Sequence, residues 1–234
     1  MYKKVYFDTL PSTNTYLKEN YQAYEDKTVI ICNNQTSGHG RLNRQWEMEP
    51  GKNIAMSILL KPKIKDISRL SLLTSAAVFL SLKKYTNNLQ IKWPNDILLN
   101  MKKVCGILLE SIFREQLEAL IIGIGINVNC NYFSDEITNK ATSLKIELHK
   151  EFKLDNIIDD ILMNFDSLYE KYLQDKHDYI EICRQYSSVI GKDVIINNKC
   201  VKVLNILDNG NLLIDNGKFH EELSFGEITL EKSY

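Results

Sequence analysis

The most informative stretch of the sequence is Ile91–Glu110, IKWPNDILLNMKKVCGILLE. Two runs rich in Ile and Leu flank a polar turn at Asn100–Lys102, a pattern typical of a β-hairpin. Before the first run, Pro94 fixes its own φ and biases the preceding residue toward an extended backbone. The sequence therefore predicts that Asn95 and Asp96 are held rigidly at the mouth of a strand.

The second run of this stretch carries two further residues of interest. Lys103 stands near its start and Gly106 within it, where a glycine lets a ligand or another backbone approach closely. Each feature also has an ordinary structural explanation, because Pro-Asn-Asp is common turn chemistry and a lysine at a strand start is usually solvated. The stretch alone leaves both interpretations open.

Composition limits the kinds of partner to expect. The 234 residues are 44% hydrophobic, which is enough for a sizeable core in one large domain or one domain plus a small one. The 29 basic and 30 acidic residues give a net charge of −1, and no long block of like charge occurs. Nonspecific binding to nucleic acid or to a membrane therefore has no global electrostatic support.

Cysteine usage and the N-terminal residues indicate a cytoplasmic protein. The five cysteines are odd in number, are widely spaced and include no Cys-x-x-Cys pair. This pattern argues against a disulfide framework or a zinc site and fits a reducing compartment. The N-terminus is too polar for a secretory signal, and no apolar run is long enough to cross a bilayer.

The N-terminal part of the chain alternates short strands with polar segments. Lys4–Phe7 is a strand candidate, after which Ser12 or Thr13 can cap a helix that continues toward Tyr21. Exposed N–H groups at such a terminus suit an anion or a polar ligand, although an ordinary capped helix is the simpler explanation for this segment taken alone. Thr28–Asn33 is predicted to be the next strand.

A polar loop follows that strand. Residues Gln35–Trp46, QTSGHGRLNRQW, contain two glycines whose backbone amides can approach a phosphate and two arginines that add directed charge. A flexible surface segment is the alternative. Beyond the loop, Gly51–Lys61 is predicted to be a strand with one strongly apolar face. Asp66–Lys84 is then predicted to be a core helix that Asp66 caps.

The segment Leu117–Val128 is predicted to be a buried strand. Gly123 and Gly125 share one face of it and form a flat patch that suits either a nucleotide or a packed helix. Asn127 continues the same face.

The C-terminal part changes its periodicity. A polar connection, Phe133–Ile146, leads to a long amphipathic helix predicted over Leu154–Arg184. After Ser188, short strands separated by Asn- and Gly-containing turns predict a small β-barrel-like appendage. These strands are Val194–Ile196, Val201–Leu204, Asn211–Ile214 and Glu227–Leu230.

Together and in this order, these motifs resemble those of the biotin–protein ligase family, also called biotin–[acetyl-CoA-carboxylase] ligases. The most specific matches are Lys92–Asp96 (KWPND), Lys103–Leu108 (KVCGIL) and Gly123–Val128 (GIGINV). Weaker matches are Ser12–Asn14, Gln35–Arg41, Ala141–Leu144 and Gly226–Ile228. The resemblance implies an α+β fold with two domains. Residues 1–187 would be a class II synthetase-like catalytic domain with helices packed on one face of a mixed sheet, and residues 188–234 an SH3-like β-barrel.

The resemblance also implies an activity. An enzyme of this family activates biotin with ATP as biotinyl-5′-AMP and transfers biotin to a lysine of a biotin carboxyl carrier protein or domain. Mg²⁺ is expected to arrive with ATP, not in a metal site built by the protein. A homodimer is compatible with the family. No nucleic-acid partner is expected, because the first strand begins almost at Met1 and leaves no room for the DNA-binding domain of many bacterial members.

Three overlapping sets of site residues follow from the same resemblance. The catalytic set is Lys103, Arg41 and Asp96. The biotin-binding set is Ser12, Thr13, Asn14, Gln35, Gly38, His39, Gly40, Arg41 and Lys103. The ATP- and adenylate-binding set is Arg41, Trp46, Lys92, Asn95, Lys103, Gly123, Gly125 and Asn127. The two cations would stabilise developing negative charge, and Asp96 would orient or deprotonate the incoming lysine.

Two alternatives to this activity stay open. In the glycine–arginine loop, His39 stands where the family usually has arginine, and Leu42 and Asn43 replace a segment that normally ends in glycine. These departures allow a catalytically weak biotin-binding regulator. A lipoate– or octanoate–protein ligase of the same fold is the second alternative, against which Trp-Pro-Asn-Asp argues because it matches the biotin branch.

Overall fold

A computed structural model describes residues 2–62, 67–196, 199–224, 226 and 228–230. The chain divides into two compact units, each of which is described by itself. Unit 1 comprises Met1–Ile67 and Leu98–Leu162, and unit 2 comprises Ser68–Ile97 and Met163–Tyr234.

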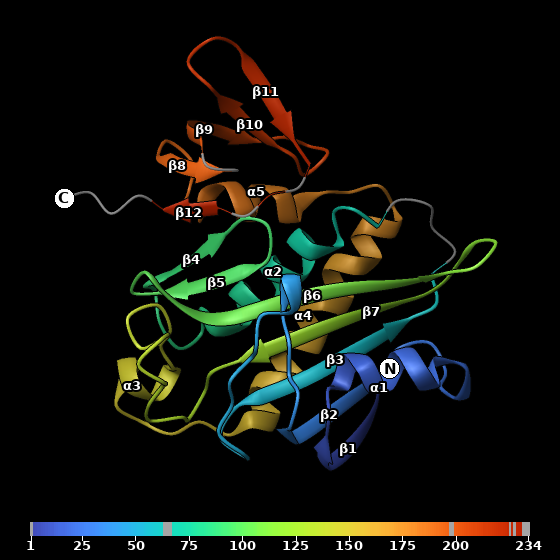
Figure 1. Ribbon diagram of the computed structural model, residues 1–234. Coiled ribbons are helices and arrows are strands. Elements are labelled where there is room, and N and C mark those ends of the chain that lie inside the picture. Colours follow the sequence, from blue (N-terminus) through green and yellow to red (C-terminus); the bar gives the residue numbers. More distant parts are fainter. Residues whose placement is uncertain (1, 63–66, 197–198, 225, 227, 231–234) are drawn as a thin grey trace. The chain divides into compact units, whose positions relative to one another are not determined.

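Unit 1 is built on a mixed β-sheet (Figure 1). Its elements are β1 (Lys3–Leu10), α1 (Thr13–Asn20), η1 (Tyr21–Ala23), β2 (Thr28–Gln35), η2 (Arg41–Asn43), β3 (Ile54–Leu60), β6 (Lys102–Phe113), β7 (Leu117–Ile126) and α3 (Leu144–Leu148). The strand order is β1-β2-β3-β7-β6. β1 pairs with β2 in parallel, whereas the other pairs are antiparallel. The predicted mixed sheet with helices is therefore confirmed.

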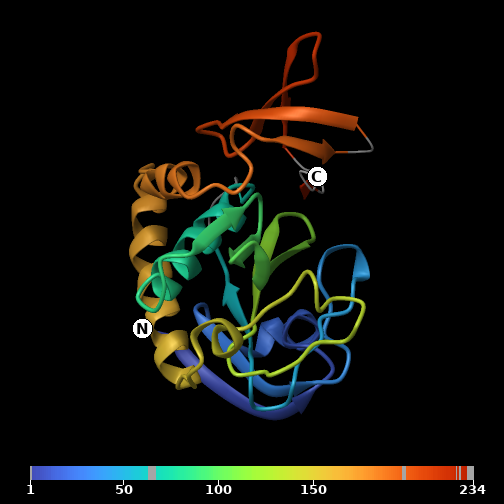
Figure 2. The same cartoon turned by 90° about the vertical axis from the view of Figure 1, so that its left-hand side faces the viewer.

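Helices cover this sheet on both faces (Figures 1 and 2), whereas the resemblance implied helices on one face. The first residues of α4 (Leu154–Leu173) lie on one face, and α1 lies on the other (Figures 1 and 2). The predicted strand is confirmed as β3, and all seven of its residues are buried, so its less apolar face with Ser57 is covered as well as its strongly apolar face. α1 approaches closely because Gly123 has no side chain: a Cβ built there would lie 2.4 Å from Asn14 Oδ1.

The predicted turn of the hairpin is confirmed. β5 (Asp96–Leu99) is joined to β6 through Asn100 and Met101, whose φ angles are 49° and 65°. Two successive positive φ angles are typical of the tight turns that match the twist of paired strands. The unit boundary falls within β5, whose first residue, Asp96, stands at the strand mouth as predicted.

Unit 2 contains helices and a second sheet. Its elements are α2 (Leu70–Leu82), β4 (Leu89–Lys92), the later part of α4, α5 (Asp178–Gln185), β8 (Asp193–Ile196), β9 (Lys199–Ile206), β10 (Leu212–Asp215), β11 (His220–Leu223) and β12 (Ile228–Leu230). The second sheet has the order β11-β10-β9-β8-β12, and its pairs are antiparallel. The predicted 187/188 boundary lies inside unit 2, between α5 and β8, and the division into domains stays a prediction.

Several element bounds differ from the sequence-based expectation. The helix predicted over Leu154–Arg184 ends at Leu173 and restarts at Asp178, because Asp175 adopts a left-handed backbone with φ 60°. α3 begins within the segment expected to be a polar connection and continues past its predicted end at Ile146, and β11 was not predicted. Asp66, the predicted cap, lies outside the described residues, and α2 begins at Leu70. In the described part of the chain, no helix has the length and apolar character needed to cross a membrane.

Candidate active site

The N-terminus of α1 forms one end of the candidate site in unit 1. Ser12 caps the helix, since its hydroxyl accepts a hydrogen bond from Thr15 N at 3.4 Å. Thr13 N donates to Gln35 Oε1, at the end of β2, over 2.8 Å. Because a backbone N–H can only donate, this bond identifies the Gln35 oxygen and leaves its Nε2 as the donor for other partners.

A chain of buried polar groups continues from this point. Ser57 on β3 is fully buried, and its Oγ lies 2.7 Å from Thr13 Oγ1 and 2.6 Å from Asn14 Oδ1. The Asn14 amide donates to Glu110 Oε2 at 3.0 Å and to Leu108 O at 3.4 Å. We call Gln35, Thr13, Ser57, Asn14 and Glu110 the polar relay. It fixes which way the amides of Gln35 and Asn14 point.

Glu110 ends the relay with a charge. Burial raises the pKa of its carboxyl, but hydrogen bonds from Lys18, at 2.8 Å, and from Asn14 outweigh it, so the pKa lies below its ordinary value of 4.5. Since the folded pKa is depressed, the carboxylate contributes stability that is present above pH 4.5. That contribution is lost as the pH falls through the lower folded pKa.

Replacing Glu110 with Gln tests the relay. For biotin, the ligand that the family resemblance implies, we expect Glu110→Gln to weaken binding by roughly three- to tenfold, the scale of one charge-assisted hydrogen bond, because Asn14 then donates to a neutral amide oxygen in place of a carboxylate. Isothermal titration with biotin at neutral pH measures the effect. Glu118→Gln is the matched control: this carboxylate, on β7, accepts from the Tyr21 hydroxyl and is not part of the relay. Equal biotin affinities for the two variants would contradict a role for the relay.

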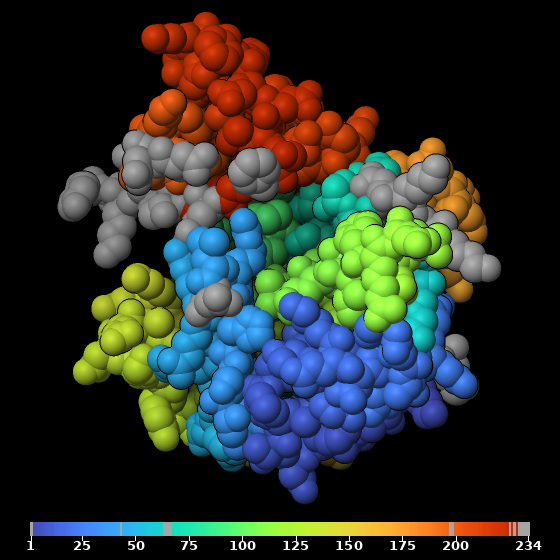
Figure 3. Space-filling model, turned by 45° about the vertical axis from the view of Figure 1, so that its right-hand side comes forward, coloured from blue at the N-terminus to red at the C-terminus, as the bar shows by residue number. Residues whose placement is uncertain are grey.

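The glycine–arginine loop folds back on itself. Trp46 N donates to Gly38 O at 2.9 Å, and Gly40 N donates to Arg44 O at 2.8 Å. A Cβ on Gly38 would lie 2.8 Å from Gln35 Nε2, so the loop backbone meets the end of the polar relay. At the far end of the loop, Leu42 adopts φ 55° and is 77% exposed. The loop, light blue in the space-filling view, forms part of the molecular surface beside the darker blue N-terminal residues (Figure 3).

A pair of glycines makes a platform for Trp46. Gly106 on β6 and Gly125 on β7 are register partners. A Cβ on Gly125 would lie 2.6 Å from Trp46 Cε2, and one on Gly106 would lie 3.1 Å from Trp46 Cζ3, so the indole lies directly against both. Lys103 Nζ stands 5.7 Å from the indole ring centroid, within the range of a cation–π attraction.

The backbone of Lys103 is fixed from the far side of β6. Lys103 N donates to Lys140 O at 2.8 Å, and Thr142 N donates to Lys103 O at 3.0 Å. The segment that begins at Ala141 thus holds the start of β6 in place, which explains the proximity of two motifs that are almost 40 residues apart in sequence. The ammonium group is positioned by a strand and not by a loop.

Two buried polar atoms mark where a ligand would be expected. Trp46 Nε1 and Asn127 Oδ1 are buried and have no hydrogen-bond partner within the part of the chain that the structure describes. Buried polar groups in proteins are almost always hydrogen-bonded, so an unsatisfied donor and an unsatisfied acceptor indicate a missing partner. Asn127 is held by its backbone, which donates to Val104 O at 2.9 Å.

Unit 1 brings together most of the residues that the sequence predicts for the site. It contains Ser12, Thr13, Asn14, Gln35, Gly38, His39, Gly40, Arg41, Trp46, Lys103, Gly123, Gly125 and Asn127. Of the two interpretations of the glycine patch, Gly123 receives the packed helix α1. Lys92, Asn95 and Asp96 belong to unit 2, where Asn95 N donates to Lys92 O at 3.2 Å in the turn after β4.

Sequence reasoning missed Ser57 and Glu110. Ser57 is the one polar residue in the strand IAMSILL, and that interruption of an apolar run was an available signal. Glu110 follows the apolar end of the Lys103–Leu108 motif and reads as an ordinary solvated residue. Among the described residues, no group of three or more His, Cys, Asp or Glu side chains is arranged to hold a metal ion.

Comparison with known proteins gives consistent matches. The model of the Biotin/lipoate A/B protein ligase family matches residues 6–127. The Bifunctional ligase/repressor BirA of Bacillus subtilis is 34% identical over 239 residues, which cover 97% of this chain and 73% of that protein. The Biotin–[acetyl-CoA-carboxylase] ligase of Paracoccus denitrificans is 37% identical over 42% of this chain and 43% of its own length.

Solved structures agree with the sequence comparison. The biotin protein ligase from Aquifex aeolicus, determined in complex with biotin and ATP, superposes with a TM-score of 0.89 at 26% identity. The match covers 100% of each chain.

Proposed function

This chain belongs to the biotin/lipoate A/B protein ligase family, and we propose that it is an ATP-dependent biotin–protein ligase. In the first step the biotin carboxylate attacks the α-phosphate of ATP, which gives biotinyl-5′-AMP and pyrophosphate. In the second step a lysine amine of the acceptor protein attacks the mixed anhydride, which gives an amide and AMP. The Paracoccus denitrificans relative and the Aquifex aeolicus structure are both named as biotin ligases, and no observation favours lipoate.

The observation that carries this proposal is the arrangement around Trp46. The glycine platform under its indole, the ammonium group of Lys103 and the polar relay belong to one unit. The unsatisfied Trp46 N–H suits a polar atom of a ligand. An apolar platform with a few directed polar groups is typical of a small-molecule site.

The relay end of the site would bind biotin. Ser12, Thr13 and Asn14 supply the helix N-terminus and hydroxyl or amide groups, and Gln35 Nε2 is free of the Thr13 bond and suits a ureido carbonyl oxygen. Gly38, His39 and Gly40 would bring backbone N–H groups of the loop to the ligand. We propose these roles from the contacts within unit 1 and from the family pattern.

Charge stabilisation would come from Lys103 and Arg41. Negative charge develops on the α-phosphate in the first step and on the carbonyl oxygen in the second, and a fixed cation stabilises both. Lys103 suits this role because β6 fixes its backbone. Arg41, on the exposed part of the loop, would act when the loop covers the ligands.

A further set of residues would bind the adenylate. We propose Trp46, Gly125 and Asn127, together with Lys92 and Asn95, as adenylate-binding residues. Gly123, which the sequence also suggested, serves instead the close packing of α1. Asp96 would orient the incoming lysine, whose free amine is scarce at neutral pH. Mg²⁺ would enter bound to the phosphates of ATP.

The finer identity of the acceptor and the location of the protein belong to the same proposal. We propose a biotin carboxyl carrier protein or domain as the acceptor, because the Paracoccus denitrificans relative is named for acetyl-CoA carboxylase. A cytoplasmic location is supported by the five cysteines, none of which forms a disulfide in the part of the chain that the structure describes.

Direct biotinylation tests the proposal. The protein is incubated with biotin, ATP, Mg²⁺ and a biotin carboxyl carrier domain, and the mass of the carrier is measured. We expect the mass to rise by one biotinyl group, and no rise when its acceptor lysine is changed to arginine. Modification by lipoate or octanoate in place of biotin would contradict the proposed substrate.

Loop closure gives a separate prediction. Trypsin is expected to cut after Arg41 or Arg44, both exposed, in the free protein. Biotin with ATP should suppress these cuts, because a loop ordered over the ligands is less accessible to the protease. Cleavage after Arg114, between β6 and β7, serves as the internal control, since this site lies outside the loop. Equal loop cleavage with and without ligands would refute closure.

A further inference from the structure

Trp93, of the Trp-Pro-Asn-Asp turn, is buried within unit 2. Its side chain is 3% exposed, and its indole Nε1 donates to Gly210 O at 2.9 Å. The two residues are 117 positions apart, and Gly210 lies in the turn between β9 and β10. The bond therefore links the second sheet to the Trp-Pro-Asn-Asp turn.

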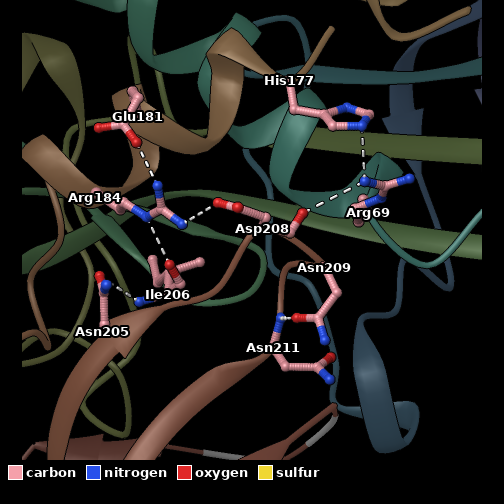
Figure 4. Close-up of polar contacts among 9 residues, drawn as sticks. All are labelled: Arg69, His177, Glu181, Arg184, Asn205, Ile206, Asp208, Asn209 and Asn211. Carbon is pink, nitrogen blue, oxygen red and sulfur yellow. Dashed lines mark hydrogen bonds and ion pairs between the residues drawn. The ribbon is translucent and has the colours of Figure 1, made fainter. Parts of the chain in front are cut away.

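The turn that accepts this bond is stabilised by hydrogen bonds between its own residues. Leu207 N donates to Asn211 O at 2.8 Å, and Gly210 N donates to Leu207 O at 2.8 Å. Asn211 N also donates to the side chain of Asn209 at 3.0 Å (Figure 4). We call Leu207–Asn211 the buttress turn.

Two arginines hold the buttress turn against the helices of unit 2 (Figure 4). Arg184, on α5, donates from Nε to Ile206 O and from Nη2 to Asp208 Oδ1, both at 2.6 Å. Arg69, just before α2, donates to Asp208 O at 3.4 Å. Asp208 is largely exposed, so we assign more of the anchoring to the bond with the Ile206 carbonyl than to the ion pair.

Gly210 is required at its position for two reasons. Its φ is +85°, a conformation that side chains with a Cβ rarely adopt. A Cβ there would also lie 3.1 Å from Arg69 Cγ and 3.2 Å from Leu72 Cδ1. A larger residue would push the turn away from α2 and withdraw the carbonyl from Trp93.

The motif is also held by α2. Pro94 O accepts hydrogen bonds from Ser71 Oγ at 3.1 Å and from Ser75 Oγ at 3.4 Å. The Trp-Pro-Asn-Asp turn is thus fixed at two points. Serines of α2 bind its backbone at Pro94 O, and the buttress turn binds the side chain of Trp93. Asn95 and Asp96 follow immediately after these two contacts.

We propose that the buttress turn of the second sheet positions Asn95 and Asp96 for catalysis, with Trp93 as the positioning residue that transmits its hold. This inference rests on the proposed function, because it assigns a task to the second sheet in the same reaction. Trp93 is not proposed to contact substrate and acts through the two residues that follow Pro94. Its task is to fix the angle at which the following two residues leave the turn.

The test uses the intact protein and two variants that remove the same bond from its two sides. Trp93→Phe keeps an aromatic ring but removes the N–H donor, and Gly210→Ala displaces the acceptor. Both should slow biotin-dependent exchange of pyrophosphate into ATP by about tenfold, and both should slow transfer from added biotinyl-AMP to the carrier. The dissociation constant of biotin should not change, because the residues proposed to bind biotin belong to unit 1.

The double variant separates positioning from simple loss of stability. Trp93→Phe with Gly210→Ala should be no slower than the slower single variant, since both remove one shared contact, whereas independent destabilisations add. Rates are measured where circular dichroism finds every variant folded. Glu181→Gln is the control, because Glu181 pairs with Arg184 on the side away from the buttress turn and should leave both steps unchanged.

Three results would overturn the inference. They are wild-type rates in both single variants, a change confined to biotin affinity, or multiplying rate losses in the double variant. Failure of the proposed function has a different signature, because the wild-type protein itself would then leave the carrier unmodified.

Discussion

Lys103→Met is expected to lower the rate of biotinyl-AMP formation by roughly 100-fold or more, the scale of losing one preorganised charge at a developing anion. Methionine keeps the length and apolar stem of lysine, so the backbone bonds with Lys140 and Thr142 should survive. The loss should therefore fall on the chemical step and not on folding. Acid quenching and separation of biotinyl-AMP measure it directly.

Lys102→Met is the matched control for this prediction. Lys102 is the adjacent residue of β6, so its side chain points to the other face of the strand, where Nζ approaches Thr138 O at 3.4 Å. The control removes the same charge from the protein but not from the glycine platform. Near wild-type adenylate formation in Lys103→Met, or an equal loss in Lys102→Met, would remove Lys103 from the catalytic assignment.

Gly123→Ala should sharply weaken biotin binding. The new methyl group would fall 2.4 Å from Asn14 Oδ1 and 2.9 Å from its Cγ, so the first turn of α1 must shift. Overpacking of this kind costs about 1–3 kcal/mol, which corresponds to a roughly 5- to 150-fold rise in the dissociation constant if the shift falls on the bound state. Titration of the purified variant with biotin gives this constant.

A variant on the other face of the same strand controls for stability. Ile122→Val removes one methyl group from a fully buried side chain, which costs about 0.5–1.5 kcal/mol of folding free energy. It should lower the melting temperature without changing biotin affinity. If Gly123→Ala bound biotin as tightly as this control does, the close packing of α1 on β7 would have no role in binding.

Local signals in the sequence were sufficient for much of unit 1. The alternation in Leu117–Val128 correctly put Gly123 and Gly125 on one face of β7, and the polar residues after Leu99 correctly predicted the hairpin turn. The sequence also predicted a helix cap at Ser12 or Thr13, and the structure identifies Ser12 as the cap. These features depend on backbone geometry over a few residues, which composition and spacing describe well.

Features that depend on distant contacts were not accessible in this way. Ser57 and Glu110 acquire their meaning only when β3 and β6 bring them to Asn14. β11 has the polar sequence HEEL, and its pairing with β10 decides its structure. The bond from Trp93 to Gly210 joins two turns whose proximity no local pattern encodes.

In the first step of the proposed reaction, this chain converts biotin and ATP into biotinyl-5′-AMP and pyrophosphate. Exchange of labelled pyrophosphate into ATP, measured without any acceptor protein, tests that step alone. We expect exchange that requires biotin, that lipoate and octanoate do not support, and that falls roughly 100-fold or more in Lys103→Met but not in Lys102→Met. No biotin-dependent exchange by the folded wild-type protein, or equal exchange with lipoate, would contradict it.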